Sequence, residues 1–335
     1  MTALPLVRTR YAHAFAHALT RLGAPTARLL HRVKLPEDVL QNRGGFIPAQ
    51  KLWGFAALAA QRTGIADLGL HAGRVPVGEH GEFGTRVVYA PTLYQAIETF
   101  CSEARAEYSR ADFYLAREGA KAWFCRGPID GTDAERQQVE LYVLMLMVQT
   151  LRLAAGPDWQ PTELRLQNND AAGLADVELL RQANVEFGRP VLGIAFPSSL
   201  LGMPLQGHGA AAKPSAQPDG AAIPPASDFL GSLRQVLRSY IRGGQVSIDT
   251  VAEIAGISVR TLQRRFAEMG LSYSGLLDEV RFQAAIPLLE DASIKLTDIA
   301  FDLGYSDPAH FSRAFRRLAG VTPREFRRQR LQTPY

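Results

Sequence analysis

The sequence predicts two parts with different folds: an α+β part in which helices outnumber strands, followed by an all-helical part. Three observations predict this. Residues 203–226 are rich in proline, glycine and alanine and lack aromatic residues, so they cannot bury a core and should form a flexible linker. Before them, helical spacing alternates with strand-like patterns, and after them only helical signals occur. We therefore expect domains at 1–202 and 227–335.

Composition narrows the classes of protein that remain. The chain has 335 residues, 47% of them apolar and 21% charged, which is an ordinary globular composition. Its two cysteines, Cys101 and Cys125, exclude a disulfide scaffold and a four-cysteine zinc module. The N-terminus lacks the apolar core of an export signal, and the longest apolar run, 141–148, is too short to span a bilayer. We expect a cytoplasmic protein with no membrane partner.

The first part begins with apolar residues at helical spacing, which predict four helices. The expected helices cover residues 11–22, 24–33, 48–63 and 92–108. Pro48 and Pro91 stand where the first turn of a helix tolerates proline, which supports the last two of these boundaries.

Alternating residues then predict strands. Two alternating runs within 111–127, separated by Gly119, predict a β-hairpin. A helix should follow over 132–155, with Thr132 or Asp133 as its N-cap. Shorter elements complete this part: a strand at 163–167, a helix near 172–183, and strands at 185–187 and 191–196. This order of helices and strands predicts an α+β fold and differs from the strand series of a cupin.

The stretch 139–151 is apolar all round its expected helix. A helix of this kind is either fully buried or packs against a partner. Burial within one domain and a homodimer contact both remain open.

Seven helices are expected after the linker. They cover residues 228–242, 247–255, 258–269, 273–290, 295–303, 308–319 and 323–331. N-cap residues support several of these starts: Ser258, Ser272, Asp307, Thr322, and either Lys295 or Thr297.

One pattern occurs twice in this second part, as VAEIAGISVRTLQRRF (251–266) and IAFDLGYSDPAHFSRAF (299–315). Each copy has a small residue in its first helix, a glycine at the turn, and two apolar anchors four residues apart in its second helix. The matching pairs are Val251 with Ile299, Ala252 with Ala300, Gly256 with Gly304, Leu262 with Phe311, and Phe266 with Phe315. Small residues allow two helices to cross closely, and glycine adopts the backbone angles that end a helix. The pattern predicts two helix-turn-helix units.

Polar residues should cover the outward face of each second helix. With the anchors inward, Arg260 and Arg264 point outward in the first unit, flanked by Thr261 and Gln263. In the second unit the outward and flanking residues are Ala309, His310, Ser312, Arg313, Arg316 and Arg317. Arginine pairs with guanine and glutamine with adenine in the major groove. Two such units in tandem indicate double-stranded DNA as the partner.

The end of the chain is strongly basic. Residues 313–330 hold seven arginines and one acid, Glu325, which leaves a net charge of +6. This is either a solvated helix end or a surface that faces phosphates. The helix over 273–290 would be about 27 Å long, a length that can hold two recognition helices about one DNA turn apart.

Residues 228–331 resemble the DNA-binding domain of the AraC/XylS family of transcription regulators. The stretch IAFDLGYSDPAHFSRAFRRLAGVTPREFR (299–327) is nearly identical to that family's signature, and SVRTLQRRF in the first unit also agrees with it. The resemblance implies a seven-helix domain with two helix-turn-helix units. It also implies a role in transcription control, with RNA polymerase as a further partner.

The resemblance assigns base contacts residue by residue. They fall on Arg260, Gln263 and Arg264 in the first unit and on Pro308, Ala309, His310 and Arg313 in the second. We expect phosphate contacts from Ser258, Thr261, Arg316, Arg317, Arg324 and Arg327. Pro308 and Ala309 cannot donate paired hydrogen bonds, so readout by the second unit should be weaker. Pro287 departs from the family pattern and is expected to kink the connecting helix.

The first 200 residues resemble the sensor region of one subgroup of that family. The resemblance rests on YAHAFAHALTRLGAPTARLLHRV (11–33), PAQKLWGFAALAAQRTG (48–64) and APTLYQAIETF (90–100). The subgroup includes regulators linked to ornithine utilisation, virulence and quorum sensing, and its sensor region is labelled arabinose-binding-like. The resemblance implies that residues 1–202 sense a small-molecule effector or form a homodimer. The effector-binding residues remain unassigned.

Other residue patterns point to no catalytic, metal or cofactor site. His13 and His17 have metal-ligand spacing on one helix but no carboxylate or cysteine beside them. The stretch GEHGEFG (78–84) lacks the lysine of a phosphate-binding loop and is expected to be a turn.

Three functions are considered for this chain. The favoured function is that of a transcription activator that responds to an effector, and the alternative is a regulator whose first domain only dimerises. An enzyme fused to a DNA-binding domain is disfavoured, because the two cysteines lack histidine and metal-binding neighbours and no catalytic triad motif occurs.

Overall fold

The computed structural model describes residues 2–169, 174, 177–206, 223–243 and 246–332. The chain divides into two compact units. We call Pro5–Lys34 with Ala49–Pro225 the mixed unit, and Met1–Leu4, Leu35–Pro48 and Ala226–Tyr335 the helical unit. The expected α+β and all-helical fold classes are confirmed. The boundaries 1–202, 203–226 and 227–335 stay a prediction, since residues 207–222 lie outside the described residues.

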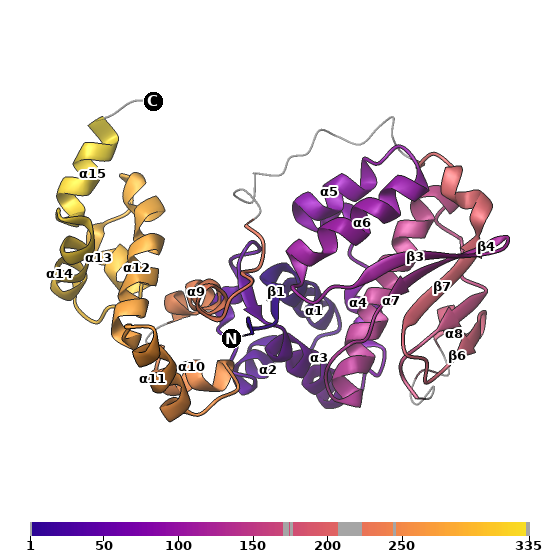
Figure 1. Cartoon of the computed structure of the whole chain (residues 1–335), viewed down its shortest axis with the longest axis horizontal. Coiled ribbons are helices and arrows are strands. Elements are labelled where there is room, and N and C mark those ends of the chain that lie inside the picture. Colours follow the sequence, from indigo (N-terminus) through magenta and orange to yellow (C-terminus); the bar gives the residue numbers. More distant parts are fainter. Residues whose placement is uncertain (1, 170–173, 175–176, 207–222, 244–245, 333–335) are drawn as a thin grey trace. The chain divides into compact units, whose positions relative to one another are not determined.

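Helices form most of the mixed unit (Figure 1). Its helical elements are α1 (Thr9–Arg21), α2 (Thr26–Arg32), α3 (Ala49–Thr63), α4 (Leu68–Ala72), η2 (Val77–Glu79), α5 (Gly81–Val88), α6 (Leu93–Glu107), α7 (Asp133–Ala155), α8 (Glu178–Arg181) and η3 (Ser198–Gly202), and a short strand, β1 (Leu6–Arg8), precedes them. The helices expected over 11–22, 24–33, 48–63, 92–108 and 132–155 are thus present. The expected helix near 172–183 is seen as α8, and its earlier residues 172, 173, 175 and 176 lie outside the described part.

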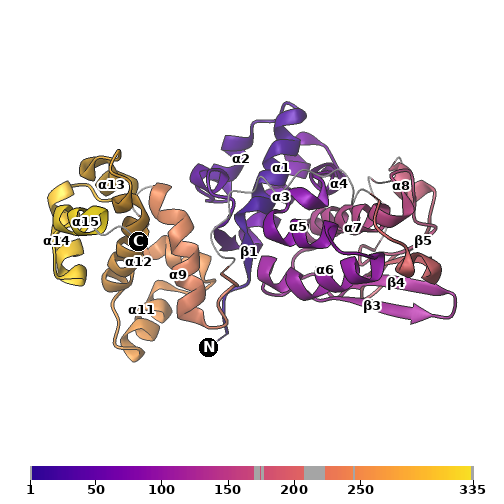
Figure 2. The same ribbon diagram turned by 90° about the horizontal axis from the view of Figure 1, so that it is seen from above.

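A five-stranded sheet completes the mixed unit. Its strands are β3 (Phe113–Glu118), β4 (Lys121–Arg126), β5 (Glu163–Arg165), β6 (Asn184–Glu186) and β7 (Leu192–Pro197), in the order β3-β4-β7-β5-β6. All neighbours are antiparallel except β5 and β6. Phe124, Ile194 and Leu164 form one cross-strand row that is completely buried. The helix α6 packs on β3, as Figure 2 shows, and the contacts place α7 against β7.

The long helix α7 is the centre of this unit. Thr132 is its N-cap, and the side chains of Thr132 and Glu135 bond each other's backbone N–H groups in a capping box. By length and composition α7 could cross a membrane, but 72% of its most apolar window is buried inside the protein. Burial therefore explains the apolar run at 139–151, and the dimer contact stays untested.

One expectation for the mixed unit was wrong, and one short helix was missed. The stretch GEHGEFG is not a turn, because residues Val77–Glu79 form a 3-10 helix and Gly81 begins α5. The glycines conceal this helix in the sequence: a Cβ on Gly84 would lie 1.8 Å from the carbonyl oxygen of Val77, so close packing requires glycine there. The short helix α4 was missed, since five residues carry too little periodicity to detect.

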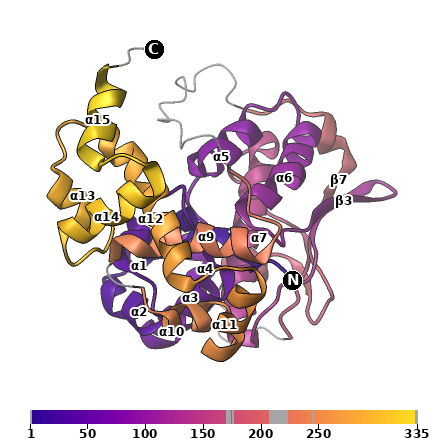
Figure 3. The same cartoon turned by 60° about the vertical axis from the view of Figure 1, so that its left-hand side comes forward.

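The helical unit contains the expected helices after the linker. They are α9 (Phe229–Tyr240), η4 (Ile241–Gly243), α10 (Ile248–Ile254), α11 (Val259–Glu268), α12 (Tyr273–Glu290), α13 (Leu296–Asp302), α14 (Pro308–Ala319) and α15 (Pro323–Gln332). Figures 1 and 3 show α10 and α11 at one end of α12, and α13 and α14 beside its other end. Pro287 lies inside α12, which continues through it as one helix.

The helical unit also contains a segment from early in the chain. Residues 35–48 hold η1 (Glu37–Leu40) and β2 (Phe46–Pro48), and both elements lie against α9. Val39 and Ile47 are 1% and 0% exposed. The N-terminus joins the same helix, where the Leu4 N–H donates to the Ser232 hydroxyl at 3.0 Å. Nothing in the sequence marks this segment as separate from its neighbours.

Candidate functional site

The first helix-turn-helix unit consists of α10 and α11. Leu262 and Phe266, the apolar anchors of α11, are 0% and 2% exposed, as their spacing predicted. The Ser258 hydroxyl caps α11 by accepting the Thr261 N–H at 3.2 Å. Gly256 ends the turn after α10 at a φ of 64°, in the left-handed region that favours glycine.

The second unit, α13 and α14, repeats this construction with one more residue in its turn. Phe311 and Phe315 are 2% and 1% exposed. The Asp307 carboxylate caps α14 by accepting the Ala309 N–H at 2.9 Å, and Pro308 occupies the first turn. Gly304 has a φ of 73°, matching Gly256. The structure therefore confirms the two-unit repeat.

Arg260, Gln263 and Arg264 are all exposed on α11. The Arg264 Nε lies 3.6 Å from the Glu268 carboxylate, and both side chains are more than half exposed. A surface ion pair of this kind contributes little, so Arg264 remains available for a partner. The three side chains together form a polar face that can donate hydrogen bonds to base edges.

The matching face of α14 offers fewer donors. Ala309, His310 and Arg313 are exposed, whereas Pro308 is half-buried. The His310 ring packs edge-on against Tyr305 with centroids 5.6 Å apart, which restrains its orientation. Arg313 and His310 are thus the side chains of this predicted set that can hydrogen-bond to bases.

A buried network joins the second unit to α12, and sequence reasoning missed it. Arg281 is 8% exposed, donates to the Gly304 carbonyl at 2.9 Å, and stacks on the Tyr305 ring at 4.4 Å. Asp278 accepts from the Tyr305 hydroxyl at 3.4 Å and from Arg317 at 2.5 Å. These contacts fix the turn of the second unit on the connecting helix. Partners 23 to 39 residues apart leave no local sequence signal.

The predicted phosphate-contacting residues differ in their exposure and in their partners within the protein. Arg316 and Arg324 are exposed, and neither forms an ion pair within the described part of the chain. Arg317 pairs with Asp278, and Arg327 donates to the Leu289 carbonyl at 3.2 Å. Ser258 and Thr261 share a hydroxyl contact of 2.9 Å at the start of α11. Among these four arginines, Arg316 and Arg324 are therefore the ones most available to a phosphate.

Glu325, the one acid in this basic end, acts as a cap. Its carboxylate accepts the Thr322 N–H and hydroxyl at 2.9 and 2.8 Å. These hydrogen bonds to the charged form lower the pKa of the carboxyl.

A separate cavity lies inside the mixed unit. It is small, with a volume of about 50 Å³. Its wall is mainly aromatic and aliphatic, with Glu107 and Arg126 as charged members. Glu107 ends α6, Arg126 ends β4, and both are at most 4% exposed. Sequence reasoning could not find this site, because its members come from eight separate elements.

Tyr142 and His80 form a second polar contact at the cavity. Burial lowers the pKa of His80 to about 4, so the ring is neutral at pH 7. Its Nδ1–H faces the Pro76 carbonyl at 3.0 Å, which leaves Nε2 to accept from the Tyr142 hydroxyl at 2.8 Å. The Tyr142 hydroxyl is thereby already engaged.

No group of three or more histidine, cysteine, aspartate or glutamate side chains within the described ranges could hold a metal ion. Cys125 is buried and Cys101 half-buried, and burial raises the pKa of both thiols, that of Cys101 to about 12. These thiols are therefore poor nucleophiles.

Two exposed recognition helices on a shared connecting helix define a double helix-turn-helix DNA-binding protein. Comparison with known families agrees. A helix-turn-helix domain model matches residues 251–329, and the model of the N-terminal arabinose-binding domain of AraC transcription regulators matches residues 23–205. The chain belongs to the AraC family of transcription regulators and is not an enzyme.

Relatives with known names are regulators as well. The ornithine utilization regulator of Pseudomonas aeruginosa is 24% identical over 342 residues, which cover 96% of each chain. The transcriptional activator RhaS of Escherichia coli is 39% identical over 87 residues, 26% of this chain and 31% of RhaS. The crystal structure of the regulator CdpR from Pseudomonas aeruginosa covers 91% of this chain and 96% of its own at 20% identity and a TM-score of 0.39.

Proposed function

We propose that this regulator activates transcription in response to a small-molecule effector. The exposed polar face of α11, held outward by the buried anchors Leu262 and Phe266, is the observation that carries the DNA-reading part. Base contacts come from Arg260, Gln263 and Arg264, with weaker readout by Pro308, Ala309, His310 and Arg313. Phosphate contacts come from Ser258, Thr261, Arg316, Arg317, Arg324 and Arg327.

The cavity in the mixed unit supports the effector response. A concave apolar site with a few buried polar groups is the usual form of a small-molecule site. Activation is supported by the match of the second part to a relative named an activator. Activation further requires a contact with RNA polymerase. The cytoplasm is the compartment in which DNA and polymerase are both available.

A homodimer formed through the mixed unit would add the avidity of two linked DNA-binding modules. Sedimentation at working concentration tests this. A monomer that binds DNA as tightly as any assembled form would remove the dimer from the proposal.

The DNA-binding part is tested by its salt dependence. Contacts to phosphates release counterions, so the affinity for duplex DNA should fall steeply between about 50 and 200 mM salt. A flat dependence would contradict phosphate contact by the basic end.

The effector response is tested by transcription in vitro with purified polymerase, with and without fractionated cell metabolites. A fraction that changes transcript yield supports it. If no fraction changes yield while DNA binding is intact, the alternative holds, in which the first part only dimerises.

A further inference from the structure

Arg126 is a buried cation without a close anionic partner. It is 2% exposed, at the end of β4, and lines the cavity of the mixed unit. Its Nη1 donates to the Gly127 and Pro128 carbonyls at 3.0 and 3.3 Å. Its guanidinium carbon lies 5.9 and 5.7 Å from the ring centres of Tyr108 and Phe113. No carboxylate of the residues that the structure describes comes within 4.0 Å of it.

The carboxylates that act on Arg126 from further away have nearer partners. Asp130 pairs with Arg110 at 2.7 Å, and Asp112 lies 3.9 Å from Arg105. The Glu140 carboxylate accepts the backbone N–H groups of Gln167 and Asn168. Burial also raises the pKa of Glu140 to about 7, so it is partly neutral at physiological pH. These groups leave the charge of Arg126 incompletely balanced.

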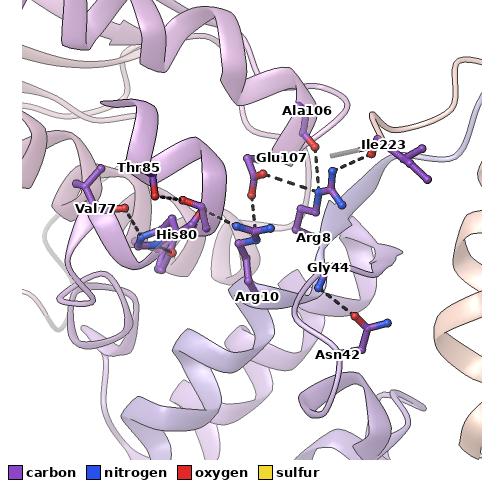
Figure 4. Close-up of polar contacts among 12 residues, drawn as sticks. Arg8, Arg10, Asn42, Gly44, Val77, His80, Thr85, Ala106, Glu107 and Ile223 are labelled. Carbon is purple, nitrogen blue, oxygen red and sulfur yellow. Dashed lines mark hydrogen bonds and ion pairs between the residues drawn. The ribbon is translucent and has the colours of Figure 1, made fainter. Parts of the chain in front are cut away.

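The negative charge of Glu107, the carboxylate in the cavity wall, is already more than balanced by two arginines. Figure 4 shows Arg8 and Arg10 both directed at it, with Nε atoms 3.8 and 3.4 Å from its two oxygens. Arg8 also donates to the Ile223 carbonyl at 2.7 Å, and Arg10 to the His80 carbonyl at 2.5 Å. Arg126 in the cavity wall, together with Arg8 and Arg10 on Glu107, therefore places three guanidinium groups near one lining carboxylate. A ligand cation placed there would meet net positive charge.

The remaining wall favours an apolar, slim ligand body. Its aromatic and aliphatic members include Phe15, Leu52, Trp53, Phe83, Phe100 and Val139. The cavity volume is only about 50 Å³, so the wall leaves a narrow slot. A narrow slot between aromatic rings accepts a flat or thin group better than a bulky polar one.

We propose that this cavity binds a small apolar monocarboxylate, with its carboxylate on Arg126 and its body between the aromatic side chains. Arginine suits this role because its planar fork matches a carboxylate with two parallel hydrogen bonds. The same arrangement disfavours cationic and zwitterionic amino acids, because Arg8 and Arg10 already occupy Glu107. The inference rests on the proposed effector response, for which it names the class of ligand.

Calorimetric titration of the full chain with three probes of one shape tests the proposal. Phenylacetate, phenylacetamide and phenethylamine carry the same ring with an anionic, a neutral and a cationic head. We expect phenylacetate to bind and to raise the melting temperature by linkage, and the other two to bind at least tenfold more weakly. Hexanoate, a thin aliphatic acid, serves as a second carboxylate. Equal binding of the amide or the amine, or no binding of either acid, overturns the proposal.

Variants of the chain distinguish the loss of the Arg126 charge from a loss of folding. Arg126→Gln should weaken phenylacetate binding at least tenfold, whereas Arg117→Gln, an exposed arginine on the neighbouring strand β3, should leave it unchanged. Circular dichroism checks both folds. If Arg126→Gln does not fold, Ala104→Leu, which narrows the cavity without touching a charge, should still abolish binding. Unchanged binding in a folded Arg126→Gln or Ala104→Leu protein overturns the proposal.

The effector response is measured separately, by comparing DNA affinity and transcript yield with and without phenylacetate. Binding through Arg126 that changes neither would leave the ligand class standing and remove the effector role.

Discussion

Arg264 and Arg327 carry the same charge in different surroundings. Arg264 projects from α11 opposite two buried anchors, whereas Arg327 is half-buried and donates to the end of α12. Arg264→Ala should cost about 1–3 kcal/mol on the preferred DNA site and relax the choice of one base pair. Arg327→Ala should weaken binding evenly across sequences and lower the melting temperature, because its hydrogen bond to Leu289 is lost.

Fluorescence anisotropy with a panel of single-base variants measures both effects. Equal losses on every duplex for Arg264→Ala, with the fold intact by circular dichroism, would remove this residue from the base-reading set.

His80 links the stability of the mixed unit to pH. Its pKa is about 4 in the folded protein, chiefly because of burial, against about 6.5 when unfolded. Between these values the unfolded state binds more protons, so the stability present above pH 6.5 is lost as the pH falls toward 4. The free energy of unfolding of the wild type, relative to His80→Gln, should therefore drop by about 3 kcal/mol over this window.

Chemical denaturation of both proteins at several pH values measures this difference. Glu140 titrates in the opposite direction, because its pKa is raised to about 7, but it is present in both proteins and cancels. A difference that stays constant from pH 7 to 4 would contradict the neutral, buried assignment of His80.

At the scale of elements, the turn of each helix-turn-helix unit depends on one glycine. A Cβ on Gly256 would meet no atom within 4 Å, so the cost of substitution there is purely conformational. Gly256→Ala should lower the free energy of unfolding by about 1–2 kcal/mol, and Gly256→Asn by less, since asparagine tolerates the left-handed region better.

Thermal unfolding of the two variants provides the comparison. Gly202→Ala is the matched control, because that glycine has open space and no positive φ. A Gly256→Ala protein as stable as this control would show that the turn can relax at no cost.

The segment 35–48 should stabilise α9 within the helical unit. Val39 in η1 is buried there, so Val39→Asp places an unpaired charge in an apolar contact. We expect a loss of about 3 kcal/mol of stability. The exposed neighbour Glu37→Gln is the control, and unfolding monitored by circular dichroism is the measurement. Equal stability of the two variants would show that η1 contributes nothing to this unit.

Elements with strong local signals could be predicted from the sequence. The helices of the second part have N-caps, proline at the first turn and apolar anchors at regular spacing, and their boundaries agree within two residues. The outward face of α11 followed from the same spacing. Short elements give a weak period: the strands β5 and β6 were expected from the sequence, whereas α4 and β2 were missed.

At the scale of the whole molecule, the features that were missed depend on distant partners. The cavity joins Glu107 on α6 to Arg126 on β4, with Tyr11 from the start of α1. The placement of residues 35–48 beside α9 spans nearly 200 residues of chain. Neither is encoded in any local pattern, so only the folded structure brings these residues together.

One chain should read two successive major-groove segments of DNA through α11 and α14. The connecting helix α12 has 18 residues, about 27 Å at 1.5 Å per residue, so the two contacts should lie about one DNA turn apart. The direct measurement takes a duplex selected from a random pool and inserts five base pairs between the two protected segments. We expect the insertion to cause a large loss of affinity and the loss of one protected segment in the footprint. Unchanged affinity and two protected segments after the insertion would contradict it.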